Sequence, residues 1–90
     1  MSGAYIQCEV FPGLFETEYY VTVNGSSAYY VDRSNVISIK GQPAQDKSVP
    51  GEVRGYVVQQ TPDKTLVQLP GEPVVGGLRT WVEKTQVRLA

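Results

Sequence analysis

The sequence contains no histidine. Histidine is the side chain that proteins use most often as a general base near neutral pH and as a metal ligand. Paired carboxylates can also perform acid-base catalysis, but they must be held at a fixed separation. Glu9, Glu16 and Glu18 crowd the start of the chain, and no second element is evident that would fix the distance between them. The glycines at 70–77 lack the lysine-serine ending and the helix of a phosphate-binding loop. We therefore expect a protein that is not an enzyme and has no cofactor or metal.

Cysteine and long apolar runs are also scarce. Cys8 is the one cysteine, so no internal disulfide can form and nothing indicates an oxidised, secreted scaffold. Cys8 alternates with Ile6 and Val10, which predicts a buried and unreactive thiol. The N-terminus has no basic segment followed by an apolar core, and no apolar run is long enough to span a bilayer. These absences favour a cytoplasmic location without a membrane segment.

Neither sign of charge dominates, because eight basic and nine acidic side chains give a net charge of -1. A chain without a global positive field does not gather phosphates, which weighs against non-specific nucleic-acid binding. Aromatic and β-branched residues are plentiful, and glycine and proline punctuate them. No segment has the periodicity of a long helix. The composition and pattern therefore predict a small all-β protein.

One seven-residue pattern occurs twice, at 30–36 and at 81–87. Each copy has an aromatic residue, a valine, an acid, a base, a hydroxyl, a carboxamide and a valine in that order. The polar middle of each copy predicts a tight turn or a single 3₁₀ turn, and the last valine begins a short strand. We expect the aromatic residue of each copy to fill the core, with a partly exposed groove floor as the alternative, and the Leu14–Phe15 pair to fold onto the core from a loop.

The repeated pattern suggests that the chain is built from two similar halves. We interpret residues 1–90 as one compact domain in which the halves are 5–39 and 51–89. The residues between them, 40–51, include two prolines and two glycines among mostly polar side chains, so they are expected to form a linker.

Residues 17–31 predict a β-hairpin whose register decides which tyrosines face outwards. Asn24 and Gly25 can adopt the positive φ angles that a type I′ turn needs at both central positions. A two-residue loop then places Tyr20 opposite Tyr29 on the outer face, and the other two tyrosines of the hairpin on the core face.

The succession of bent strand, hairpin, single polar turn and short last strand resembles the SH3-like small-barrel group. In that group an aromatic residue leads into a 3₁₀ turn and a final strand, as at 30–36 and 81–87. A spacing similar to the opening strand of KOW- and Tudor-type members occurs at Gly51, Val53, Gly55 and Val57. Each half is a strand short of a five-stranded barrel, and the acidic aromatic cluster of peptide-binding SH3 loops is missing. The resemblance therefore implies an SH3-like small barrel, or a pseudo-duplicated β-sandwich or barrel, without proline-peptide recognition.

Three functions from different classes fit these observations. The first is a non-enzymatic interaction module that binds a protein partner or itself as a homodimer, because short halves leave strand edges exposed. Its surface is predicted to comprise outward aromatic and loop residues: Tyr20, Tyr29, Pro73, Val74 and Val75. The second is a nucleic-acid-binding small β-barrel that uses four cations: Arg33, Arg54, Arg79 and Lys84. The third is a small ligand-binding protein or enzyme with a pocket between the halves.

Overall fold

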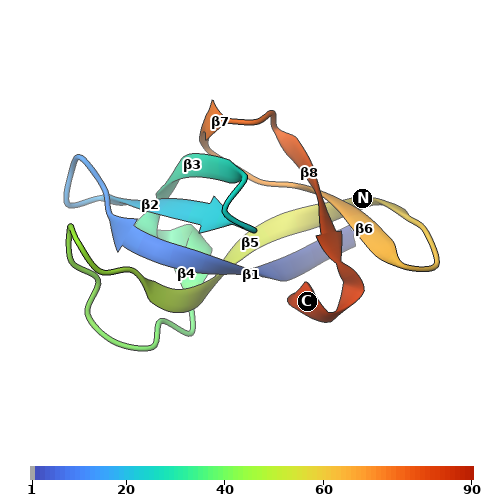
Figure 1. Ribbon diagram of the computed structural model, residues 1–90, viewed down its shortest axis with the longest axis horizontal. Coiled ribbons are helices and arrows are strands. Elements are labelled where there is room, and N and C mark those ends of the chain that lie inside the picture. The colour runs from blue at the N-terminus through green and yellow to red at the C-terminus, as the bar shows by residue number, and fades with distance from the viewer. Residues whose placement is uncertain (1) are drawn as a thin grey trace.

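The computed structural model describes residues 2–90, and strands make up most of them (Figure 1). Nine strands form one antiparallel sheet that curls into a half-barrel, so the predicted all-β class is confirmed. The only helices among these residues are two single 3₁₀ turns, each of three residues, which are too short to cross a membrane. The elements in chain order are β1 (Ser2–Pro12), β2 (Glu18–Val23), β3 (Ser27–Asp32), η1 (Arg33–Asn35), β4 (Val36–Ile37), β5 (Val49–Gln60), β6 (Lys64–Gln68), β7 (Glu72–Val75), β8 (Arg79–Glu83), η2 (Lys84–Gln86) and β9 (Val87–Leu89).

The long strands β1 and β5 form the centre of the sheet. The strand order is β7-β3-β2-β1-β5-β6-β8, and β4 joins β5 while β9 joins β1. Ile6 on β1 lies opposite Val53 on β5. β4 is attached to β5 through Val36, which pairs with Val53, and β9 is attached to β1 through Val87, which pairs with Ile6. The strands that follow η1 and η2 therefore return to equivalent places on the central pair.

Both predicted polar turns are single 3₁₀ turns, as expected from their hydrogen-bonding side chains. The Asp32 carboxylate accepts hydrogen bonds from the backbone N–H of Ser34 at 2.9 Å and from its hydroxyl at 2.7 Å. At the second turn, the Gln86 side chain accepts a hydrogen bond from the backbone N–H of Glu83 at 2.9 Å. Local side chains thus satisfy backbone donors that a one-turn helix leaves free.

The core lies inside the curl of the sheet and is made mostly of valine. It is formed by alternate residues of the strands, which are Ala4, Ile6, Cys8, Val10, Val21, Val23, Tyr29, Val31, Val36, Val49, Val53, Val57, Val67, Leu69 and Val82. Cys8 is buried as predicted. Burial, with smaller contributions from the charges of Glu9 and Glu52, raises the pKa of the Cys8 thiol to about 12. The thiolate is therefore scarce at neutral pH, and Cys8 acts as a small apolar side chain.

The turn between β2 and β3 has the predicted conformation but one more residue than predicted. Asn24 and Gly25 have φ angles of 57° and 66°, and the N–H of Ser26 donates to the carbonyl oxygen of Val23 at 3.2 Å. The first pair of the hairpin is nevertheless Val23 with Ser27, so Ser26 is an additional residue on the β3 side. The register of the hairpin is shifted by one position.

This shift reverses the two faces of β3, because neighbouring residues of a strand point to opposite sides. Tyr29 pairs with Val21 and is fully buried, and its hydroxyl donates to the carbonyl oxygen of Gly77 at 2.8 Å. Tyr30 pairs with Tyr20 on the outer face instead. The prediction that Tyr29 faces outwards is therefore wrong, and this residue belongs to the core.

Three other expectations differ from the structure. Leu14 and Phe15 do not cover the core: they are 71% and 69% exposed in the turn between β1 and β2. Trp81 is not a core residue either, because the alternation of β8 places Val82 inside and leaves the indole 42% exposed. The linker predicted at 40–51 is also shorter, since β5 already begins at Val49.

Candidate interaction surfaces

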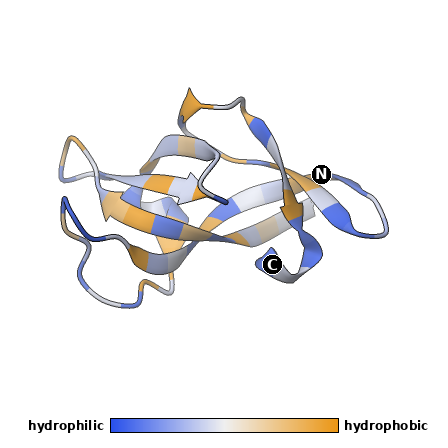
Figure 2. Ribbon diagram, in the orientation of Figure 1, coloured by the Kyte–Doolittle hydropathy of each residue, from blue (hydrophilic) through white to orange (hydrophobic). Residues whose placement is uncertain are grey.

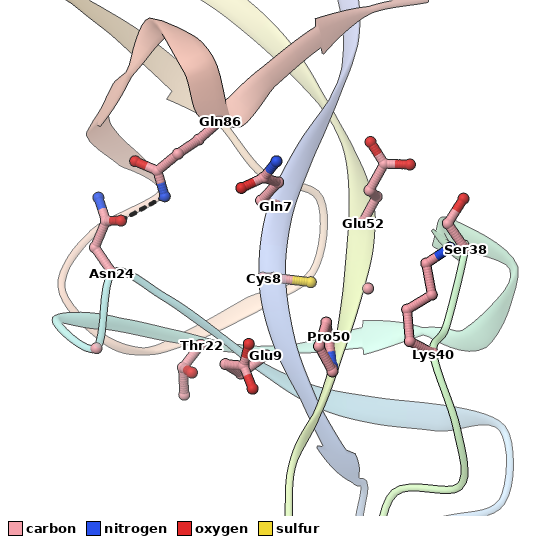
Figure 3. A pocket seen from close by; sticks show the side chains of 12 residues that line it. Gln7, Cys8, Glu9, Thr22, Asn24, Ser38, Lys40, Pro50, Glu52 and Gln86 are labelled. Atoms are coloured by element: carbon pink, nitrogen blue, oxygen red, sulfur yellow. Dashed lines mark hydrogen bonds between the residues drawn. The ribbon is translucent and has the colours of Figure 1, made fainter.

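A polar groove of about 610 Å³ lies between the two halves, over β1 and β5 (Figure 3). The Gln86 amide from η2 donates to the Asn24 side-chain oxygen at 2.6 Å and so joins the two halves across it. Among its charged residues, Glu9 accepts a hydrogen bond from Ser48 at 2.9 Å, and Glu52 is paired with Arg88. Within residues 2–90, no group of three or more acidic or cysteine side chains gathers to hold a metal. The hollow anticipated between the halves is therefore an open groove whose carboxylates already have neighbours.

A second hollow, which we call the acidic groove, has a volume of about 480 Å³. It lies between the β1–β2 turn, the end of β3 and the start of β7, and its lining residues are Leu14, Phe15, Thr17, Glu18, Tyr30, Val31, Asp32, Gly71 and Glu72. Gly71 has a φ of 110°, and a Cβ atom there would lie 2.3 Å from the carbonyl oxygen of Tyr30. Only glycine allows the backbone to approach Tyr30 so closely, and this contact sets one wall of the groove.

The charges that line the acidic groove are all negative. They are the carboxylates of Glu18, Asp32 and Glu72, and none lies within 4.0 Å of a lysine or arginine nitrogen of residues 2–90. Hydrogen bonds from the backbone N–H and the hydroxyl of Ser34 hold the pKa of Asp32 below its usual value. Glu16, exposed in the adjoining turn, adds to the negative potential, and Arg33, whose backbone N–H donates to the carbonyl oxygen of Thr17 at 3.0 Å, opposes it. The groove thus combines an apolar floor with an anionic rim.

A row of aromatic rings crosses the outer face of the sheet and ends at the acidic groove. The rings of Phe11 and Tyr20 lie 5.9 Å apart between centroids, and those of Tyr20 and Tyr30 lie 5.1 Å apart. Tyr30 itself lines the groove. Tyr20, which the sequence predicts as an outward residue, is half-buried within this row, and its packing contributes to the stability of the hairpin.

The predicted contact residues at 73–75 form a strand rather than a loop. β7 pairs with β3 along one edge and ends the sheet, and all four of its residues are exposed. Val74 and Val75 are each 52% exposed, and the tip of β7 is correspondingly orange in Figure 2. Pro73 cannot donate a backbone hydrogen bond, which makes strand addition at this edge less favourable. Of the residues of β7, Glu72 lines the acidic groove, and Val74 and Val75 are exposed outside its lining.

A second exposed surface, the basic aromatic patch, covers the outer face of β5, β6 and β8. Its members lie on paired strands and alternate with core residues, and they are Arg54, Tyr56, Leu66, Gln68, Arg79 and Trp81. Arg79 donates to the side-chain oxygen of Gln68 at 3.1 Å, which holds the guanidinium beside the strand. Tyr56 and Trp81 are 43% and 42% exposed.

The structure brings together only some of the cations predicted to contact nucleic acid. Arg54 and Arg79 share the basic aromatic patch, and Lys84 lies next to it in η2, where its ammonium donates to Gln60 at 3.4 Å. Arg33 belongs to η1 in the other half of the chain and stacks over the ring of Tyr19 at 4.4 Å. The four cations therefore do not form one continuous surface.

A cluster at the junction of β1, β5 and β9 makes the stability depend on pH. Arg88 donates two hydrogen bonds to the Glu52 carboxylate, at 3.1 and 3.2 Å, and lies 4.6 Å from the ring centroid of Tyr5. The hydrogen bonds from Arg88 lower the pKa of Glu52, against the opposing effect of burial. The charged form of Glu52 therefore stabilises the fold, and this contribution is present above the pKa of the unfolded chain and lost as the pH falls through the lower folded value.

We accordingly expect Glu52→Gln to be less stable than the wild type at pH 7 and equally stable near pH 3. Urea unfolding at several pH values measures the difference. Glu83→Gln is the control, because Glu83 is exposed and its contact with Lys64 is a long 3.9 Å, so a small and flat difference is expected. A difference for Glu52→Gln that stays constant from pH 7 to pH 3 would contradict this assignment.

Comparison with known proteins finds no family model, no curated protein and no solved structure that matches the chain. The function must therefore be inferred from the surfaces themselves. The sequence did not identify Leu14, Phe15 and Tyr30 as binding residues. One signal was present: the Leu-Phe pair follows Pro-Gly and precedes two glutamates, a polar setting in which apolar side chains are less easily covered.

Proposed function

We propose that this protein is a non-enzymatic interaction module, and that its acidic groove binds a cationic and partly apolar segment of a protein partner. The observation that carries this proposal is the combination of two strongly exposed apolar side chains, Leu14 and Phe15, with a rim whose charges are all negative. An apolar surface in a small soluble domain is commonly a contact site, and a rim of one sign selects partners of the opposite sign.

The geometry is suited to a few side chains that project from a partner. The volume of the groove, about 480 Å³, falls in the range of roughly 300–1,000 Å³ that is usual for binding clefts. An apolar or aromatic side chain would lie against Phe15 and Tyr30, while arginine or lysine would reach the carboxylates of Glu18 and Glu72. Burial of the apolar atoms supplies affinity, and the charges supply orientation and a faster association.

The test is a titration followed by amide chemical shifts, with a short peptide that alternates arginine with leucine and phenylalanine. We expect shift changes confined to the turn at 13–18, the end of β3 and residues 71–75, because these segments surround the groove. Phe15→Ser and Glu72→Lys should each weaken binding about tenfold, which corresponds to about 1.4 kcal/mol. Leu89→Ser and Asp46→Lys are matched controls, since they change an exposed apolar and an exposed acidic residue away from the groove.

A twin peptide with glutamate in place of arginine distinguishes groove recognition from unspecific apolar contact. It should bind at least about tenfold more weakly. Equal affinity for the two peptides, or equal losses in the control variants and the groove variants, would rule out the acidic groove as the binding site.

The same proposal includes three finer points of architecture and setting. We infer that the halves are copies of one unit, and the equivalent attachment of β4 to β5 and of β9 to β1 supports this. The half-barrel and its single 3₁₀ turns support a relationship to SH3-like small barrels. A cytoplasmic setting is supported by a single cysteine, which is buried as a free thiol.

A further inference from the structure

We infer that one occupant of the acidic groove is a second copy of this chain, which docks with its basic aromatic patch in a head-to-tail arrangement. This inference rests on the proposed function of the groove and names the partner. A segment that fits the groove must offer exposed cations next to exposed aromatic side chains. The basic aromatic patch offers both on a single rigid sheet face.

The charges of the two surfaces are complementary and available. Arg54 and Arg79 have no carboxylate within 4.0 Å among residues 2–90, and the groove carboxylates likewise have no cation. The one acid on the same face of β8, Glu83, lies 3.9 Å from Lys64. Docking would therefore pair free charges without breaking existing salt bridges at the centre of either surface.

The apolar parts are also complementary. Trp81 and Tyr56 project from the patch with more than two fifths of their surface exposed, and Leu14 and Phe15 line the groove with more than two thirds exposed. Large aromatic residues that enter an apolar hollow, with charged residues around them, are the usual anchors of protein interfaces. Trp81 would be the anchor, and Arg79, two residues earlier on β8, would reach Glu72.

The placement of the two surfaces decides the kind of assembly. In Figure 1 the β1–β2 turn beside the groove lies at the left of the molecule, and β6 and β8, which carry the patch, lie at its right. The groove and the patch are both fixed on one sheet, so a chain does not place its own patch in its own groove. Because groove and patch are different surfaces, each copy can bind one neighbour on each side, which gives open chains or closed rings. This arrangement differs from the symmetric homodimer expected from exposed strand edges.

Two charge reversals on different chains test this directly by sedimentation velocity. Wild-type protein should assemble as its concentration rises, and salt should weaken the assembly. Glu72→Lys damages the groove and leaves the patch intact, while Arg79→Glu damages the patch and leaves the groove intact. Each variant alone should be monomeric, with self-association weakened about tenfold or more. Mixed in equal amounts, they should assemble again, since the intact groove of one variant meets the intact patch of the other and the two reversed charges are themselves opposite in sign.

Several results would overturn the inference. These are a wild type that stays monomeric at millimolar concentration, single variants that assemble as the wild type does, or a mixture that remains monomeric. Binding of a single-stranded oligonucleotide that is lost in Arg79→Glu, with the wild type monomeric, would assign the patch to nucleic acid instead. The arginine-containing peptide is titrated into Arg79→Glu in parallel. If it binds there while the wild type does not self-associate, the groove keeps its proposed function and only the second copy is excluded.

Discussion

Replacement of Tyr29 by alanine is expected to lower the free energy of unfolding by about 3–5 kcal/mol. Tyr29 is the largest fully buried side chain of the core, and its ring packs among valines of β2 and β3. Removal of the ring leaves a cavity and also leaves the carbonyl oxygen of Gly77 without its 2.8 Å hydrogen bond. A domain of this size has a total free energy of unfolding of about 5–15 kcal/mol, so the variant would lose much of its stability.

Equilibrium unfolding in urea, followed by tyrosine and tryptophan fluorescence and by circular dichroism, measures this loss. Tyr29→Phe should lose only about 1 kcal/mol, because it keeps the ring and gives up the hydrogen bond. Tyr20→Ala is the matched control on the outer face, where the half-buried ring should contribute about 1 kcal/mol of cross-strand packing. If Tyr20→Ala proved more damaging than Tyr29→Ala, the hairpin register described above would be incorrect.

Replacement of Gly55 by valine should destabilise the protein by at least about 3 kcal/mol. A Cβ atom at this position would lie 2.7 Å from the carbonyl oxygen of Gln68, 2.8 Å from Ile6 Cδ1 and 3.0 Å from Leu69 Cδ2. The backbone of β6 cannot move away without breaking its pairing with β5, so the strain cannot be relieved by a side-chain rotation. The absence of a side chain is what allows β5 to approach β6 closely at this point while it pairs with β1.

Thermal unfolding of Gly55→Val and Gly55→Ala beside Gly77→Ala tests this. Gly77 is exposed, and no atom would lie within 4 Å of its added Cβ, so its replacement should change the stability by less than about 0.5 kcal/mol. The alanine variant at position 55 should fall between the other two. Native stability in Gly55→Val would show that β5 and β6 can separate here and would contradict the close approach.

The features that local chemistry decides could be predicted from the sequence. The polar residues at 33–35 and 84–86 form 3₁₀ turns because the neighbouring acid or carboxamide bonds to the local backbone. These predictions needed no knowledge of the rest of the chain, since each depends on side chains within a few residues.

The register of the first hairpin could not be predicted in this way. Asn24 and Gly25 do form the positive-φ turn, but Ser26 is left out of the first strand pair. Either register directs a tyrosine of β3 towards the core, Tyr30 in the predicted one and Tyr29 in the observed one, so burial of a tyrosine does not distinguish them. The core accommodates Tyr29, whose hydroxyl finds a partner at Gly77, and this partner lies far along the sequence. A distant carbonyl group thus decides a pairing that local rules assign differently.

Only part of the candidate surface could be predicted, because the exposure of the other residues depends on segments far along the sequence. Tyr20 is half-buried on the outer face of β2, and Pro73, Val74 and Val75, which were expected in a loop, are exposed on β7. Leu14 and Phe15 were assigned to the core because apolar residues usually enter it. Only the fold shows that, within residues 2–90, no strand covers the turn that carries Leu14 and Phe15. The two side chains therefore stay exposed and line the acidic groove.

The central position of β1 has a consequence for the order in which this protein folds. β1 is synthesised before its partners on β5 and β9, which belong to the second of the two halves. Until those residues have been translated, the apolar side of β1 has only the β2–β3 hairpin to cover it. The central pair can therefore form only after β5 has been synthesised, so the long-range contacts of β1 come late in folding.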